Sequence, residues 1–112
     1  KFILNFLFGK PHQNRTYEEL VVTYQKSLLN GGKAGSQFIP KNVSISKKNE
    51  LIDDLNKLIK SLNEKIERLS EQDLDKYILP HPLIGKISIR EMLYFTIYHV
   101  QHHHKTVVEN IN

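Results

Sequence analysis

The sequence predicts an all-α protein with a single domain. Apolar residues recur at three- and four-residue steps over two long stretches, and a Ser/Thr-x-x-Glu signature precedes two helical segments. No β pattern of convincing length occurs. A chain of 112 residues is long enough for one compact domain and too short for two ordinary ones. We therefore treat residues 1–112 as one helical domain.

The composition is that of an ordinary globular protein, with 39% hydrophobic and 25% charged residues. The absence of cysteine excludes disulfides, thiolate ligands and cysteine nucleophiles, so nitrogen and oxygen atoms would have to hold any metal. The apolar runs fall far short of the roughly 20 residues that span a bilayer. The opening segment also lacks the cleavage site of a signal peptide. We therefore expect no membrane association and a cytoplasmic location.

The net charge of +4 is unevenly distributed along the chain. Residues 1–50 carry eight Lys or Arg against three acids, and the remaining residues carry eight against nine. A basic patch attracts nucleic acid, but this one lacks interleaved aromatic residues and helix-turn-helix spacing. We therefore expect no nucleic-acid partner.

The first two helices are predicted from the residues at their ends. Residues 2–8 have the apolar character of the last turns of a helix that ends at Gly9. Thr16 and Glu19 then form a capping box, in which each side chain satisfies a free backbone N–H. The second helix should therefore run over about residues 17–29.

A long connector follows at residues 31–47. Gly31 offers the left-handed residue that ends the preceding helix. The connector has three glycines and a proline and no sustained period. Connectors of this length tend to be functional or mobile. We expect Phe38 and Ile39 to pin this one to the core.

The clearest helical period lies at residues 46–69. These residues predict a helix of about six turns with one apolar stripe. Opposite charges four residues apart occupy its other face. We favour a bundle helix over a coiled coil, because only about three heptads are present. A homodimer through this helix is a further alternative. The stripe consists of Leu51, Ile52, Leu55, Leu58, Ile59, Leu62, Ile66 and Leu69.

The last helix is predicted at residues 89–109, because Ser88 and Glu91 form a second capping box before a periodic segment. The preceding residues 70–87 contain a possible short helical turn and then His81 between two prolines. The prolines restrict the backbone there. We expect His81 to be a turn residue whose ring caps a backbone group.

Four histidines fall within six positions of the last helix, at residues 99 and 102–104. His99 and His103 are four apart and therefore share one face. His103 falls within the apolar sector and His99 at its margin, so both should look into the bundle, whereas His102 projects toward the boundary. Two imidazoles at this spacing are able to bind one divalent ion through their ring nitrogens.

The histidine pair leaves two interpretations open. The run His-Val-Gln-His-His lacks the glutamate of the HExxH zinc proteases, which excludes that reaction. Two ligands also fall short of the three that a catalytic zinc site needs, and neither His12 nor His81 has a spacing that argues for a third. The alternative is that both are packed core residues with hydrogen-bonded partners.

Residues 81–107 resemble the C-terminal part of the DinB/YfiT-like superfamily. The matching features are a His-Pro pair and a glycine, a Ser-x-x-Glu entry to the last helix, and two inward histidines four residues apart. Residues 8–41 are also similar to the connector region of one branch of this superfamily. The matching positions are His81, Pro82, Gly85, Ser88, Glu91, His99 and His103.

The resemblance implies an up-down four-helix bundle in which three histidines hold a divalent metal, often nickel or zinc. Two ligands map onto His99 and His103, and the third belongs to a helix near the N-terminus. No histidine precedes His12, so we expect an N-terminally truncated version of the bundle. His102 is a candidate for the pocket or for a place beside the ligands.

The activities that the resemblance implies are those of thiol-dependent S-transferases or metal-dependent hydrolases. A small thiol and an electrophilic substrate would then be the partners. The resemblance identifies no catalytic residue. The alternative function is that of a noncatalytic helical-bundle binding protein with packed histidines and no metal.

Overall fold

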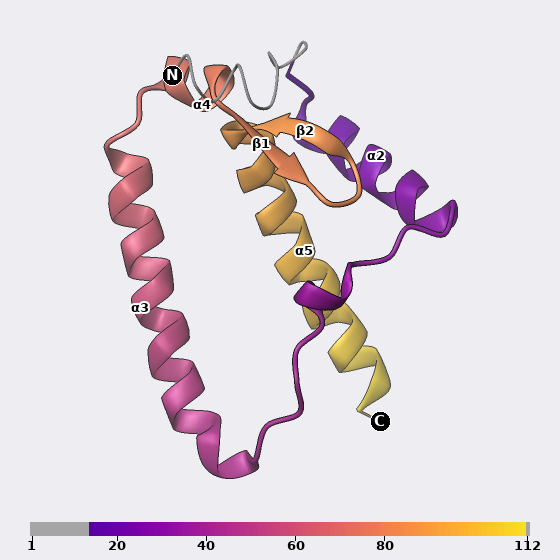
Figure 1. The fold of residues 1–112 in the computed structure, drawn as a ribbon, viewed down its shortest axis with the longest axis vertical. Helices are drawn as coiled ribbons and strands as arrows, with labels where there is room; N and C mark the ends of the chain where they lie inside the picture. The colour runs from indigo at the N-terminus through magenta and orange to yellow at the C-terminus, as the bar shows by residue number, and fades with distance from the viewer. Residues whose placement is uncertain (1–13, 112) are drawn as a thin grey trace.

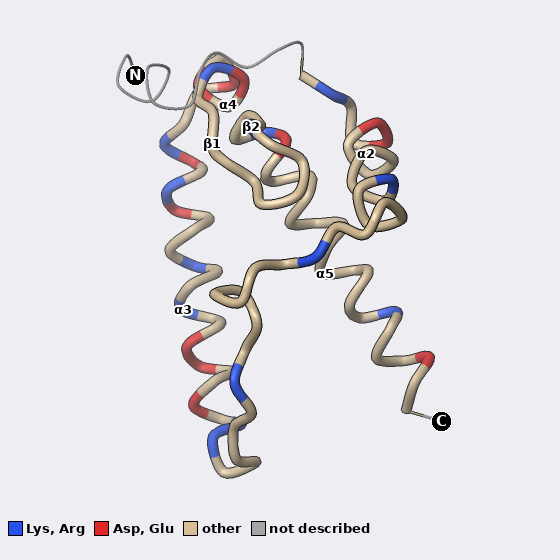
Figure 2. The backbone as a smooth tube through the Cα atoms, turned by 45° about the vertical axis from the view of Figure 1, so that its right-hand side comes forward, with Lys and Arg blue, Asp and Glu red and all other residues tan. Residues whose placement is uncertain are grey.

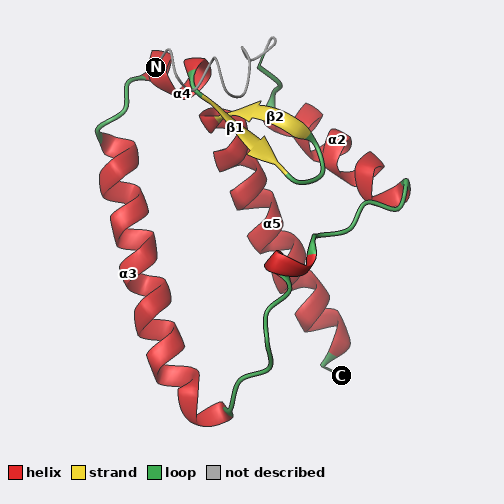
Figure 3. Ribbon diagram, in the orientation of Figure 1, coloured by secondary structure: helices red, strands yellow, loops and turns green. Residues whose placement is uncertain are grey.

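The computed structural model describes residues 14–111, and most of these residues are helical, which confirms the all-α prediction (Figure 3). The helix predicted at residues 2–8 and the histidine at position 12 lie outside the described residues. None of the described helices has the length and apolar character needed to cross a membrane. The described elements are α2 (Tyr17–Leu29), the 3₁₀ turns η1 (Ser36–Phe38) and η2 (Ile45–Lys47), α3 (Lys48–Glu67), α4 (Glu71–Lys76), β1 (Ile78–His81), β2 (Gly85–Ser88) and α5 (Ile89–Asn110).

Helix α5 is the element on which most of the others assemble. Helix α2 packs against it, and α4 and the hairpin of β1 and β2 pack against its N-terminal half (Figure 1). The contact with α2 is largely aromatic, with ring centroids 4.9 Å apart for Tyr24 and Phe95 and 5.9 Å apart for Tyr17 and Tyr94. Edge-to-face pairs of this kind add to the apolar burial. The small core therefore lies around the first half of α5.

The capping signals place both of these helices as predicted. Helix α2 spans Tyr17–Leu29 behind the capping box of Thr16 and Glu19. It ends before Gly31, whose φ of 87° lies in the left-handed region that favours glycine. Helix α5 begins at Ile89, directly after its own capping box.

The capping box of α5 is buried and carries a long-range ion pair. Ser88 is 0% and Glu91 3% exposed. One carboxylate oxygen of Glu91 accepts from the backbone N–H of Ser88 at 3.0 Å. The other accepts from Nη1 of Arg15 at 2.7 Å, from the segment just before α2. A single carboxylate thus fixes the start of α5 and ties it to the start of α2.

The β-hairpin was not expected from the sequence, and the prediction that no strand occurs is wrong. Strands β1 and β2 pair antiparallel, with Ile78 opposite Ser88 and His81 opposite Gly85. Gly85 closes the turn with a φ of 79°, which only glycine adopts readily. Ile78 of β1 and Ile87 of β2 are both fully buried. Each strand has only four residues, too few for a period to be recognised.

Helix α3 has the predicted period, but its apolar stripe is not packed by the described residues. Leu51, Ile52, Leu55, Leu58, Ile59 and Leu62 are 44–68% exposed. The helix contacts mainly η2, the turn directly before it, and runs beside the rest of the fold (Figure 1). Basic and acidic residues are interspersed along it (Figure 2). The expectation that bundle packing within the described chain accounts for this stripe is therefore wrong.

Ile87 and Leu58 should respond very differently to truncation. We expect Ile87→Ala to cost about 2–4 kcal/mol of unfolding free energy, because it leaves a cavity in the core. Leu58→Ala should cost less than about 0.5 kcal/mol, because the side chain is already exposed. Urea unfolding of both variants measures the difference. Similar losses would instead show that the face of α3 is covered in solution, as in a homodimer.

The buried capping box should matter more than an exposed one. Glu91→Ala leaves the Ser88 N–H and the Arg15 guanidinium without their partner, and we expect a loss of about 2–4 kcal/mol. The matched control is Asp73→Ala, which removes the corresponding carboxylate acceptor of the Ser70 N–H from the exposed box at α4. We expect about 1 kcal/mol or less there. Equal losses in thermal unfolding would contradict a special role for the burial of Glu91.

Candidate functional site

The two histidines predicted as metal ligands meet on the surface of α5. Their Nε2 atoms are 2.9 Å apart, and their ring centroids are 4.3 Å apart with planes at 87°. The i,i+4 spacing brings the rings together, since residues four apart lie one turn above each other. His99 and His103 therefore aim one nitrogen each at the same small region.

The spacing of these nitrogens fits two neighbouring ligands of one ion. Ligand nitrogens about 2.0–2.1 Å from a zinc ion lie roughly 2.9–3.3 Å from each other, depending on the angle at the metal. The distance of 2.9 Å between Nε2 of His99 and Nε2 of His103 lies at the short end of this range. Within residues 14–111, no third histidine or acid joins them in a cluster that could hold an ion. The described chain thus offers two of the donors that a metal needs.

The burial of the pair differs from the helical-wheel expectation. His103 was expected to lie deeper than His99, but His103 is exposed and His99 is half-buried. The reason is that the contacts of α5 with α2 and the hairpin concentrate on its N-terminal half. His99 lies one turn closer to these contacts.

Both histidines line a cavity of about 590 Å³, here called the histidine cavity. Its walls come from α2, the connector before α3, the hairpin and α5. Phe38 and Ile39 of the connector belong to it, although they are 56% and 64% exposed. The expectation that these two residues are pinned into the core is therefore wrong. The lining residues are Tyr24, Ala34, Phe38, Ile39, Pro40, Pro80, His81, Pro82, Leu83, Met92, Phe95, His99 and His103.

His81 is the most deeply buried imidazole of the cavity, at 6% exposure. Its Nδ1 accepts from the backbone N–H groups of Leu83 at 3.1 Å and Ile84 at 3.3 Å, which confirms the predicted capping role. Its Nε2 is closed off from solvent and has no hydrogen-bond partner in the described chain. Leaving such a group unpaired costs about 1–3 kcal/mol.

The ring of Phe95 contacts both the buried His81 and the half-buried His99. It stacks on His99, with centroids 4.9 Å apart and planes at 24°. It also meets His81 edge to face, with centroids 4.2 Å apart and planes at 77°. Tyr24 packs against the same three rings. These contacts hold His99 in the orientation that presents Nε2 to His103.

Burial favours the neutral form of the inner imidazoles. The pKa of His81 is lowered by desolvation and by repulsion from His99. The pKa of His99 is lowered by desolvation and by repulsion from His103 and His102. Neutral imidazoles keep a free lone pair near pH 7, which is the form that binds metals.

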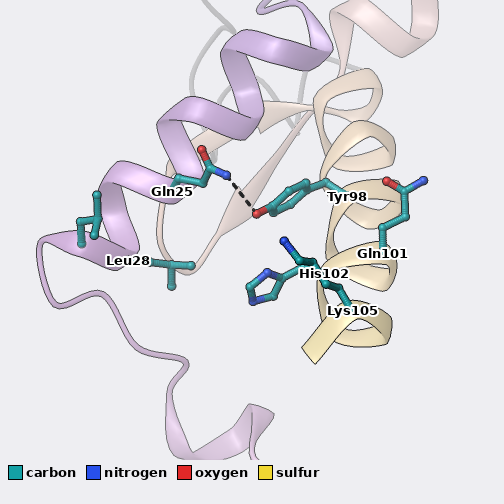
Figure 4. A pocket seen from close by; sticks show the side chains of 7 residues that line it. Gln25, Leu28, Tyr98, Gln101, His102 and Lys105 are labelled. Carbon is teal, nitrogen blue, oxygen red and sulfur yellow. Dashed lines mark hydrogen bonds between the residues drawn. The ribbon is translucent and has the colours of Figure 1, made fainter. Parts of the chain in front are cut away.

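His102 lies in a different cavity, between α2 and the second half of α5 (Figure 4). Its ring stacks on Tyr98, with centroids 5.8 Å apart. Tyr98 in turn accepts a hydrogen bond from Nε2 of Gln25 at 3.3 Å, marked in Figure 4. Leu28, Leu29 and Lys105 also line this cavity. The structure thus places His102 beside a pocket, on another side of α5 from the histidine cavity.

The family of the chain follows from a comparison of its sequence. A family model of the DinB superfamily matches residues 2–107, which include the hairpin and nearly all of α5. The chain belongs to the DinB superfamily. Comparison with curated proteins and with solved structures gave no match. Membership of the DinB superfamily agrees with the fold and leaves the activity open.

Sequence reasoning missed that Nε2 of His81 is buried and has no partner within the described chain. It predicted the ring as a cap for the turn but not the second nitrogen, since the cavity is assembled from four separate segments. The signal in the sequence was the single histidine between two prolines next to Gly85. Such a rigid turn is able to hold a ring in one orientation.

Acidification should destabilise this DinB-superfamily protein. His81 and His99 have lowered pKa values in the folded chain, so the unfolded chain binds protons more readily as the pH falls below about 6.5. Their contribution to stability is present above that pH and is lost as the pH falls toward the folded-state values. Urea midpoints at about pH 7.5 and about pH 5.5 measure the loss.

A substitution pair assigns this acid sensitivity. His81→Asn should remove part of the pH dependence, because the amide does not titrate. The control His104→Asn should leave it unchanged, because His104 is exposed. Equal midpoints at both pH values in the unsubstituted protein would contradict the lowered pKa values.

Proposed function

We propose that this DinB-superfamily protein is a divalent-metal-dependent enzyme with His99 and His103 as two of its ligands. The observation that supports this most directly is the 2.9 Å separation of their Nε2 atoms at the edge of a cavity. Zinc or nickel suits imidazole donors. The remaining ligands would come from solvent, substrate or groups outside residues 14–111.

The chain's own residues would prepare the site in two ways. Phe95 fixes the ring of His99 by stacking, so little side-chain freedom is lost when a ligand binds. The lowered pKa of His99 keeps its nitrogen unprotonated near pH 7. A bound divalent ion would supply Lewis acidity and lower the pKa of a coordinated thiol or water.

The proposed reaction class is thiol-dependent transfer to an electrophile, or hydrolysis. In both reactions the electrophile must bind beside the nucleophile. The histidine cavity offers an uncharged binding site next to His99 and His103. No Asp or Glu residue of the described chain lines this cavity. We therefore assign no general base.

Metal binding by the full-length, untagged protein tests the proposal. We expect about one tightly held ion per chain by plasma mass spectrometry, with affinity lowered at least about tenfold by His99→Ala or His103→Ala. The protein should be purified without a nickel column, because the run of three histidines binds nickel adventitiously. His104→Ala is the matched control, since it removes an exposed histidine of the same helix.

Two results would overturn the proposal. The first is unchanged affinity in both ligand variants. The second is the absence of bound metal in a protein whose fold persists, which would favour a noncatalytic binding protein whose histidines are packed against each other. The hydrogen bond that links the two Nε2 atoms would then be their whole role.

A further inference from the structure

We infer that the histidine cavity binds a small, uncharged, mainly apolar molecule, and that Nε2–H of His81 donates a hydrogen bond to an acceptor oxygen of that molecule, such as a carbonyl. Only the identification of this molecule as the electrophilic substrate of an enzyme rests on the proposed function. Its binding to the cavity, however, requires no metal. The two ideas are therefore able to fail separately.

The tautomer of His81 follows from its hydrogen bonds. Nδ1 accepts from two backbone N–H groups, those of Leu83 and Ile84, so it carries no proton. The proton of the neutral ring must then be on Nε2. This assignment makes Nε2 a donor with no lone pair to offer, and it excludes His81 as the third ligand of a metal at His99 and His103.

The donor has no adequate acceptor in the described chain. Buried polar groups in native proteins nearly always have a partner, so an exception needs an explanation. Two aromatic rings of the described chain lie near the ring of His81, Phe95 with centroids 4.2 Å apart and Tyr24 with centroids 6.2 Å apart. A π face is a weak acceptor compared with an oxygen. A ligand oxygen would satisfy the group fully.

The walls of the cavity define the rest of the ligand. Apart from the imidazoles and one tyrosine, the described lining consists of apolar side chains and prolines, without Lys, Arg, Asp or Glu. A charged ligand would lose its hydration there without gaining an opposite charge. An apolar molecule with one acceptor group matches these walls. Since Nε2 is closed off from solvent, the ring or its neighbours must shift slightly on binding.

A pair of probes of similar shape tests this inference on the full-length, metal-free protein. Acetophenone has a carbonyl oxygen, and ethylbenzene has none. We expect acetophenone to bind at least about threefold more tightly in NMR titrations, as one neutral hydrogen bond would produce. The shifts should map to the lining of the histidine cavity. Nitrogen-15 shifts of the His81 ring should show the proton on Nε2.

His81→Asn is the deciding variant. The amide oxygen of asparagine takes the position of Nδ1 and preserves the cap of the turn, but the Nε2–H donor is lost. We expect the preference for acetophenone to disappear while ethylbenzene binds as before. His104→Asn, at an exposed position on α5, should keep the preference.

Several outcomes would overturn the inference. These are equal affinities of the two probes in the unsubstituted protein, a preference that survives His81→Asn, or a ring proton on Nδ1. If the variant does not fold, the probe ratio and the ring nitrogen shifts of the unsubstituted protein decide. A protein that binds no metal but prefers acetophenone would refute only the proposed function. A protein that binds metal but does not prefer acetophenone would refute only the inference about His81.

Discussion

The carboxylate of Glu91 is the constraint on which the rest of this fold depends. It accepts from the backbone of Ser88 and from the guanidinium of Arg15, so the starts of α5 and α2 are held together. Both Ser88 and Glu91 are buried, and no solvent competes for these bonds. Because α2 then runs along α5, Tyr24 reaches Phe95 and the wall of the histidine cavity. The geometry of the site therefore depends on the Ser88–Glu91 capping box, which lies more than one helical turn away along α5.

A second constraint sets the chemistry of the cavity. The hairpin turn is closed by Gly85 and by the Nδ1 cap of His81, so the ring of His81 has one orientation. Phe95 transmits that orientation to His99 through its two ring contacts. His81 and His99 thus both contact the same phenyl ring, and the two bonds to Nδ1 of His81 place the proton of its neutral ring on Nε2.

The predictable parts of the structure are those encoded by neighbouring residues. The capping boxes and Gly31 fixed the ends of α2 and the start of α5, and the i,i+4 spacing placed His99 against His103. The hairpin escaped prediction because two four-residue strands carry little periodic signal. The stripe of α3 shows which face is apolar but not what covers it. The cavity was not predicted either, because its walls come from segments far apart in the chain.

The two cavities beside α5 show how one helix separates two kinds of chemistry. His99 and His103 border apolar walls without a charged residue, whereas His102 lies in a pocket whose lining mixes leucines with Gln25, Tyr98 and Lys105 (Figure 4). Consecutive histidines diverge by about 100° around a helix, so adjacent positions in the sequence reach different surroundings. An imidazole is a useful ligand only where burial keeps it neutral and packing keeps it still. Of the histidines in this run, His99 and His103 are the two that border the histidine cavity, and Phe95 stacks on His99.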